Sequence, residues 1–197
     1  MNVLFDMDGV LVDSKDAWFR SFQDIGEVNR EEFERRYWGR DLEANVKDLG
    51  TTRAEFCETV LPRYLHEIDL VPEAKAVLSS LTGKKALITN TTSRCTARIL
   101  KQHDLNGYFD AIVTSDEVDR GKPDPAIIEL AMSRIGAVSD DTVVIGDSDH
   151  DIKAGKAAGC ITVGIGVDAD HRVERLSDLP PVLAQLEIDK AKKGENR

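Results

Sequence analysis

Two aspartates separated by one residue follow an apolar run near the start of the chain, in the segment VLFDMDGVLVDS. Side chains two residues apart in an extended segment point to the same side, so Asp6 and Asp8 face the same space. Two carboxylates this close repel each other unless one is protonated or a cation lies between them. An oxygen-only site suits Mg²⁺, which usually retains several waters. Turn and helix-capping roles are the alternative interpretation when this motif is taken by itself.

A second acidic segment, IGDSDHD, ends another apolar run. Asp147 stands at the tip of that run, between Gly146 and Ser148, and it adds a carboxylate to the candidate metal site. Asp149 and Asp151 also fit the first turn of a helix, where the helix dipole favours negative charge. The sequence leaves the role of Asp149 open.

Two further segments carry groups that bind anions. In LITNTTSR, Thr89 and Asn90 end an apolar run, and the helix that follows offers free N–H groups, so the three features together form an anion cradle. In RGKPDP, Lys122 precedes a proline that restricts its backbone and directs its charge. Simple helix caps, especially for Thr91, and a solvated loop lysine are the alternative interpretations. All of these segments lie at the carboxyl ends of predicted strands or beside them, where open parallel sheets bind ligands.

The elements that must position these residues alternate between strands and helices. Apolar runs predict buried strands at residues 2–6, 85–89, 111–114, 142–146 and 161–165. Amphipathic patterns predict helices at residues 72–82, 93–104, 123–135, 150–158 and 180–187. The alternation indicates an α/β fold, namely a Rossmann-like, doubly wound parallel sheet that is covered by helices on both faces.

Residues 14–70 interrupt this alternation. They contain no strand-like run, hold both tryptophans and show amphipathic stretches at residues 15–25, 29–37, 42–49 and 52–68. We expect a small all-α domain inserted into a sheet domain that consists of residues 1–13 and 71–197. The polar end of the chain, from Ile188 onward, is expected to fray.

Composition limits the functions of this chain. Of its 197 residues, 41% are hydrophobic and 31% are charged, which is ordinary for a globular protein, and its net charge of −10 repels nucleic-acid phosphates. No apolar run approaches the ~20 residues that span a bilayer, and the N-terminus lacks a secretory signal pattern. Three separated cysteines without a CxxC pair argue against a disulfide framework and a zinc site. We therefore expect a cytoplasmic protein without nucleic-acid or membrane partners.

Taken together, the four segments resemble the motifs of the haloacid dehalogenase superfamily, in the same order. They are DMDGVLVDS (6–14), ALIT (86–89), GKPDP (121–125) and GDSDHD (146–151). The helical insertion resembles the cap of the phosphoglycolate phosphatase and β-phosphoglucomutase branch. The resemblance implies a Mg²⁺-dependent phosphatase that hydrolyses a small phosphorylated metabolite through an aspartyl-phosphate, with phosphoglycolate as the nearest named substrate.

The resemblance also implies a role for each acidic residue. Asp6 is the nucleophile, and Asp8 acts as general acid and then as general base. Mg²⁺ is held by the Asp6 carboxylate, the Asp8 backbone carbonyl and Asp147, with Asp151 as a ligand or as an anchor behind the ligands. True dehalogenases lack the aspartate that corresponds to Asp8, so its presence disfavours dehalogenation.

The same resemblance assigns the phosphate oxygens to Thr89, Asn90 and Lys122. In the cap, Arg40 follows a glycine in a loop where relatives often place a substrate-facing residue, and an exposed loop arginine is the equal alternative. Trp38 is interpreted as core packing.

Two other functions remain open at this point. A phosphomutase of the β-phosphoglucomutase type would pass the phosphate to a second hydroxyl instead of water. A receiver-like phospho-acceptor module uses similar residues, but receivers carry the phospho-aspartate on the third strand, whereas the acidic pair here follows the first. A monomer or a homodimer fits the sequence, and the identity of the phosphorylated metabolite is left open.

Overall fold

A six-stranded parallel sheet forms the centre of the computed structural model, which describes residues 1–195. Its spatial order is β5-β4-β1-β6-β7-β8. The strands are β1 (Asn2–Phe5), β4 (Lys85–Thr89), β5 (Ala111–Thr114), β6 (Thr142–Gly146), β7 (Ile161–Ile165) and β8 (His171–Val173). The five predicted strands are all present, and β8 was not predicted because its sequence, HRV, is short and mostly polar. β1 pairs with β4 on one side and β6 on the other, so the first motif lies between the second and the fourth.

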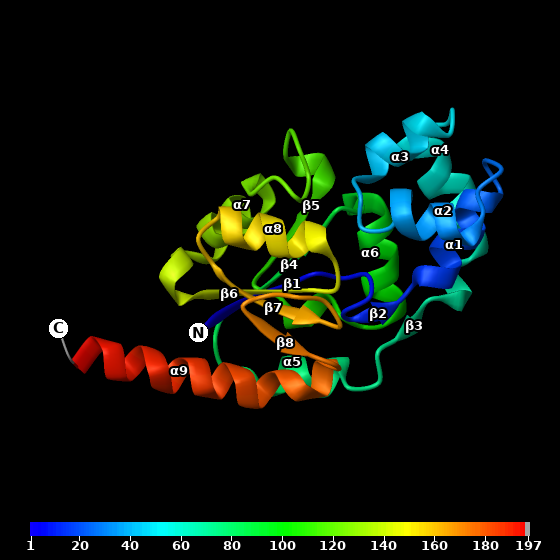
Figure 1. Ribbon diagram of the computed structural model, residues 1–197. Coiled ribbons are helices and arrows are strands. Elements are labelled where there is room, and N and C mark those ends of the chain that lie inside the picture. The colour runs from blue at the N-terminus through cyan, green and yellow to red at the C-terminus, as the bar shows by residue number, and fades with distance from the viewer. Residues whose placement is uncertain (196–197) are drawn as a thin grey trace.

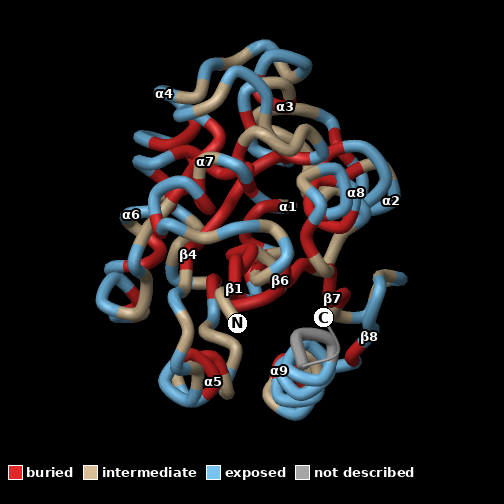
Figure 2. Tube along the Cα trace, turned by 90° about the vertical axis from the view of Figure 1, so that its left-hand side faces the viewer, coloured by how far each residue is buried: buried red, intermediate tan, exposed pale blue. Residues whose placement is uncertain are grey.

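Helices cover both faces of this sheet, which confirms the predicted doubly wound α/β fold (Figure 1). α7 (Ala126–Ile135) and α8 (Asp149–Ala157) cover one face, and α5 (Ala74–Ser80), α6 (Ser93–Gln102) and α9 (Leu179–Glu195) cover the other. Side chains alternate along the strands, so Leu4 packs under α7 and α8 while Val3 and Phe5 pack toward the opposite helices. Figure 2 shows that the central strands β1, β4 and β6 are buried.

The C-terminal helix is longer than predicted. α9 continues through the polar segment that was expected to fray, as far as Glu195, and residues 196–197 lie outside the described residues. Within the described part of the chain, no helix combines the length and the apolar character that crossing a membrane would require.

Between β1 and β4 the chain forms a helical unit, residues 14–70, which we call the cap; the remainder is the core. The chain enters and leaves the cap through an antiparallel ribbon of β2 (Val12–Asp13) and β3 (Asp69–Leu70), which was not predicted. The α-helices of the cap are α1 (Lys15–Gln23), α2 (Arg30–Glu32), α3 (Leu42–Asp48) and α4 (Arg53–Glu55). π-Helical turns continue α2 and α4, at Phe33–Tyr37 and Phe56–Val60, and 3₁₀ turns follow at Leu61–Arg63 and Leu65–Glu67. Aromatic rings fill the interior of the cap. The ring centroid of Phe22 lies 5.6 Å from that of Phe33 and 5.4 Å from that of Tyr37.

Cys57 of the cap and Cys95 of α6 form a disulfide, contrary to the expectation that the cysteines stay unpaired. The two residues are 38 positions apart, and the sequence does not show that the cap folds against α6. The cap and α6 also make noncovalent contacts. For example, the side-chain amide of Gln102 in α6 donates to the carbonyl oxygen of Leu65 in the cap at 2.7 Å. Cys160 is free and buried on the opposite face of the sheet. The cap is therefore covalently attached to the core at a point outside the ribbon.

Candidate active site

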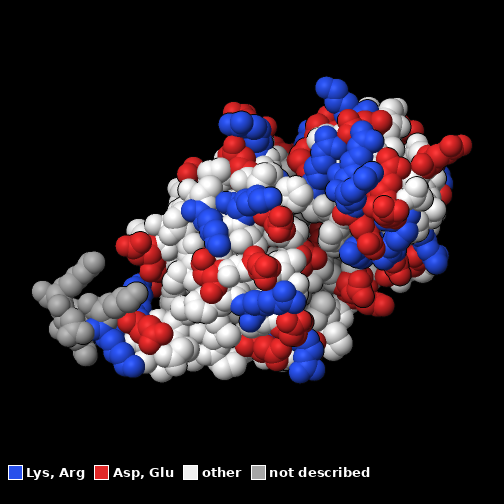
Figure 3. All heavy atoms as spheres, in the orientation of Figure 1, with Lys and Arg blue, Asp and Glu red and all other residues white. Residues whose placement is uncertain are grey.

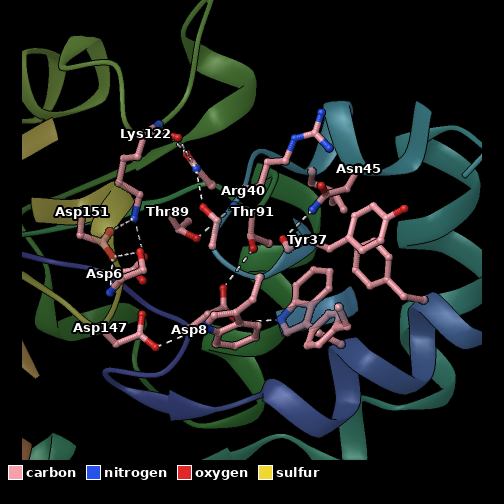
Figure 4. Close-up of a pocket in the computed structure, with 18 residues that line it drawn as sticks. Asp6, Asp8, Tyr37, Arg40, Asn45, Thr89, Thr91, Lys122, Asp147 and Asp151 are labelled. Atoms are coloured by element: carbon pink, nitrogen blue, oxygen red, sulfur yellow. Dashed lines mark hydrogen bonds and ion pairs between the residues drawn. The ribbon is translucent and has the colours of Figure 1, made fainter. Parts of the chain in front are cut away.

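Asp6 and Asp8 lie just beyond the carboxyl end of β1, at the floor of a pocket between core and cap (Figure 4). The loop after β1 turns at Gly9, whose φ of +78° favours glycine. A Cβ atom at Gly9 would lie 2.0 Å from Oδ2 of Asp147, so a side chain here would displace that carboxylate. The glycine of the first motif thus allows the β1 and β6 loops to approach each other.

Lys122 is buried between two carboxylates. Its Nζ atom lies 2.7 Å from Oδ1 of Asp6 and 2.6 Å from Oδ1 of Asp151, and it also donates to the carbonyl oxygen of Ile88 at 3.2 Å. Burial alone would lower the pKa of Lys122, but Asp151 and Asp6 raise it above its ordinary value. The ammonium group therefore stays charged and is held against Asp6.

Three donors hold the carboxylate of Asp8. The hydroxyl of Ser14 (2.5 Å) and the indole N–H of Trp18 (2.7 Å) donate to Oδ1, and the hydroxyl of Thr91 (3.1 Å) donates to Oδ2. Burial raises the pKa of Asp8, and these hydrogen bonds partly offset the rise. Asp8 is thus held by its own set of donors and oriented separately from Asp6.

Asp6, Asp147 and Asp151 form the acidic cluster, in which one carboxylate oxygen from each lies within 4.8 Å of the others. Burial raises the pKa of Asp147 to about 7, with repulsion from Asp151 adding to the effect. Burial and the same neighbour also raise the pKa of Asp6. Three carboxylates face one ammonium group here, so the cluster fits a hard divalent cation by both charge and donor type. The side chain of Asp8 lies outside this cluster.

The predicted phosphate-binding residues line the same pocket, but their side chains differ in how many hydrogen bonds they already make to the protein. Thr89 is buried, lines the pocket and accepts a hydrogen bond from the N–H of Thr91. The side-chain amide of Asn90 is fully engaged by protein, since it donates to the carbonyl oxygens of Gly39 and Lys122 and accepts from the N–H of Lys122.

The cap supplies the opposite wall of the pocket. Arg40 lines the pocket, and its guanidinium lies 2.6 Å from Asp48. Trp38, which was interpreted as core packing, also lines the pocket, and its indole N–H lies 3.4 Å from Asp147. Sequence reasoning likewise missed Trp18 and treated Thr91 as a helix cap. The only available signal for both tryptophans was their position within the insertion.

The central sheet, the helical insertion and the acidic pocket at the end of β1 define an α/β protein whose site lies at the carboxyl edge of a parallel sheet. The chain belongs to the haloacid dehalogenase-like hydrolase family, whose family model matches residues 3–165. This agrees with the resemblance of the motifs and makes the protein a hydrolase of that family.

Relatives of known name cover most of the chain. Pyrophosphatase PpaX of Bacillus velezensis is 30% identical over 90% of this chain and 93% of its own length. A phosphorylated carbohydrates phosphatase of Thermotoga maritima is 32% identical over 80% of this chain and 81% of its own. The crystal structure of a hydrolase from Pseudomonas syringae is 26% identical, with a TM-score of 0.78 over 93% of this chain and 98% of that chain.

Proposed function

We propose that this protein is a Mg²⁺-dependent phosphatase that hydrolyses the phosphomonoester of a small metabolite through an aspartyl-phosphate. The observation that carries the proposal is the 2.7 Å contact between Lys122 Nζ and Asp6 Oδ1 in a pocket that Asp8 also lines. A buried ammonium group beside the attacking carboxylate reduces the repulsion between that carboxylate and a phosphate dianion.

The two aspartates of the first motif then take different roles. An oxygen of Asp6 attacks phosphorus, the bond from phosphorus to the leaving oxygen breaks, and the carboxylic acid of Asp8 gives its proton to that oxygen. Water next attacks the aspartyl-phosphate while the Asp8 carboxylate takes its proton, which releases inorganic phosphate and restores both aspartates. The direction of the pKa shift of Asp8 agrees with this role, because burial favours the protonated carboxyl group that a general acid needs.

The acidic cluster is the proposed place for the metal. The carboxylates of Asp6 and Asp147 and the backbone carbonyl of Asp8 would hold Mg²⁺, which when bound neutralises charge on the phosphate and the aspartates. Both oxygens of Asp151 already accept hydrogen bonds, one from Lys122 and the other from Ser148, which favours the anchoring role for this residue.

The substrate-binding residues follow from the same pocket. Thr89 and Lys122 would hold phosphate oxygens, while Asn90 keeps the loop of Lys122 in place. The cavity between core and cap has a volume of only about 50 Å³, and this size supports a small metabolite. The names of the Bacillus and Thermotoga relatives, a pyrophosphatase and a phosphatase of phosphorylated carbohydrates, also support a small phosphorylated substrate.

Hydrolysis of p-nitrophenyl phosphate with Mg²⁺ and with EDTA tests the proposal. We expect activity only with the metal, and a loss of about a thousandfold or more in Asp6→Asn. Mass spectrometry of acid-quenched enzyme should find phosphate on Asp6. Asp149→Asn is the matched control, since Asp149 is an exposed acid of the fourth motif that pairs with Lys153. An active Asp6→Asn enzyme, or no hydrolysis of any phosphate ester, would contradict the proposal; conversion of β-glucose 1-phosphate to glucose 6-phosphate would favour the mutase.

A further inference from the structure

The pocket has two chemically distinct halves. The core half carries the aspartates, Lys122 and the loop of Thr89, and it accounts for the phosphoryl group. The cap half consists mainly of aromatic and aliphatic side chains, namely Trp18, Phe22, Phe33, Tyr37, Trp38 and Leu42. Figure 4 shows Tyr37, one of these residues, on the side of the site opposite Asp6 and Lys122. Because a phosphatase must place the alcohol of its substrate beyond the phosphorus atom, this cap half is where the leaving group lies.

Asn45 of α3 places one unpaired acceptor among these apolar walls. The residue lines the pocket and is 3% exposed. Its Nδ2 atom donates to the carbonyl oxygen of Tyr37 at 2.9 Å, which fixes the orientation of the amide. Its Oδ1 atom is buried and has no hydrogen-bond partner. Thr96 and Ser115 are the other described residues with a buried unpaired side-chain oxygen, and neither lines the pocket. An orphaned acceptor at a ligand pocket calls for a donor from the ligand.

The cationic side chains that line the pocket are already paired with carboxylates of the protein. Of the residues that line the pocket, only Lys122 and Arg40 are cationic, and all of these lining residues are described. Lys122 lies between two carboxylates, and Arg40 pairs with Asp48, which also lies 3.3 Å from Arg36. In Figure 4 the guanidinium of Arg40 points away from the aspartates, and in Figure 3 the basic side chains on the visible face of the cap lie next to acidic ones.

This charge pattern disfavours a leaving group with its own negative charge. A carboxylate or a second phosphate in the cap half would be buried against aromatic rings and the acceptor of Asn45, without a free cation. A hydroxyl, by contrast, satisfies that acceptor and leaves the carbon skeleton to pack against the rings.

We propose that the cap half is a subsite for a neutral, hydroxylated leaving group, so that the substrate is the phosphomonoester of a small polyol or sugar whose hydroxyl donates to Asn45 Oδ1. This inference rests on the proposed phosphatase function and narrows its substrate class. It separates the protein from enzymes that act on phosphoglycolate or pyrophosphate.

Two pairs of substrates that differ at one position test the inference. 2-Hydroxyethyl phosphate and phosphoglycolate differ only in a CH₂OH group against a carboxylate, as do glycerol 3-phosphate and 3-phosphoglycerate. We expect kcat/KM to be higher for the hydroxylated member of each pair by about tenfold or more, the ratio that one satisfied hydrogen bond provides. Pyrophosphate should be as poor a substrate as the carboxylates. Equal or reversed preference in both pairs would overturn the inference, whereas lack of activity toward p-nitrophenyl phosphate as well would overturn the phosphatase function itself.

Variants at two cap positions, Asn45 and Asp48, test which residues cause the preference for hydroxylated over carboxylated substrates. Asn45→Leu removes the acceptor at similar volume, and we expect kcat/KM for glycerol 3-phosphate to fall about tenfold. The value for p-nitrophenyl phosphate, whose leaving group offers no hydroxyl to the subsite, should fall by a much smaller factor. An equal fall for both substrates would show that Asn45 serves only the fold and would overturn its role. Asp48→Asn releases Arg40 from its partner and should narrow the gap between glycerol 3-phosphate and 3-phosphoglycerate; an unchanged gap would contradict the charge argument.

Discussion

The side-chain amide of Asn90 donates a hydrogen bond to the carbonyl oxygen of Gly39, 2.9 Å away, across the boundary between core and cap. The same amide holds the main chain of Lys122 at both its N–H and its carbonyl group, each at 2.8 Å. One buried side chain therefore joins the loop of the cap that closes over the pocket to the loop that carries the lysine. Closure of the cap and the position of Lys122 are linked through this residue.

Asn90→Asp tests this link at nearly constant shape. The substitution replaces a donor by an acceptor that faces two carbonyl oxygens, so we expect a loss of about 2–3 kcal/mol in unfolding free energy. We also expect kcat/KM for p-nitrophenyl phosphate to fall about tenfold or more, since misplacing a catalytic group is costly. Denaturation and steady-state kinetics measure both. Asn106→Asp makes the same change at a solvent-exposed position outside the cap and should alter neither the unfolding free energy nor kcat/KM. If the two variants had the same stability and the same kcat/KM, the link would be contradicted.

Trp18→Phe separates the indole N–H from the ring. The ring stacks on Phe56 at 5.5 Å, which phenylalanine can retain, while the hydrogen bond to Asp8 is lost. Because that bond lowers the pKa of Asp8 and orients it, proton transfer to the leaving group should suffer. We expect kcat to fall about tenfold for alkyl phosphates, whose leaving oxygen needs the proton. The decrease should be smaller for p-nitrophenyl phosphate.

Trp38→Phe is the control for this comparison, because the indole N–H of Trp38 bonds to Asp147 instead of Asp8. It should slow both kinds of substrate by a similar factor. If Trp18→Phe also slowed both alike, its role in orienting the general acid would be wrong.

The acidic cluster should make the stability of the metal-free protein depend on pH. Burial raises the pKa of Asp147 from 3.8 to about 7 in the folded protein. At a pH between these two values, the folded state therefore holds a proton that the unfolded state has released. Stability from this group is complete below the lower value and is lost as pH rises through about 7. In EDTA we therefore expect the melting temperature to fall between pH 5 and pH 8.

Added Mg²⁺ should raise the melting temperature more at pH 8 than at pH 5, because the metal replaces the lost protons. Asp147→Asn should flatten part of the pH dependence in EDTA, since asparagine does not titrate. A melting temperature that rises with pH over this range, in EDTA, would show that the cluster is ionised without a metal.

Thiol chemistry checks the bond between cap and core. Under denaturing conditions without reductant, we expect one titratable thiol, that of Cys160, and three after reduction. Reduction, or Cys57→Ser, should lower the unfolding free energy by about 2–4 kcal/mol, because the closed loop no longer restricts the unfolded chain. Cys160→Ser should leave the effect of reductant unchanged. Three thiols before reduction would show that the cysteines are unpaired.

The sheet and its order could be predicted because each buried strand is a continuous apolar run that ends in a polar motif. The side chains of Leu4, Ile88 and Val144 pack in one buried cluster, and their pattern is local. The contacts of Asp8 could not be predicted in this way, since Trp18 and Thr91 reach it from α1 and from the β4 loop. The pairing of Cys57 with Cys95 also depends on how the insertion folds against α6, and local pattern carries no information about that contact.

The same pairing restricts how the cap can move. Both chain connections pass through the β2–β3 ribbon, and by itself such a ribbon would allow rotation in several directions. The bond from Cys57 to α6 adds a second fixed point, so the remaining rotation is about the line through the ribbon and the disulfide. Among the described residues, the loop at Gly39 is joined to the core by hydrogen bonds and not by a covalent link, so we expect this edge of the cap to be the one that opens. Substrate would then enter past Gly39 and Trp38, and its leaving group would pass the aromatic wall before its phosphate reaches Asp6.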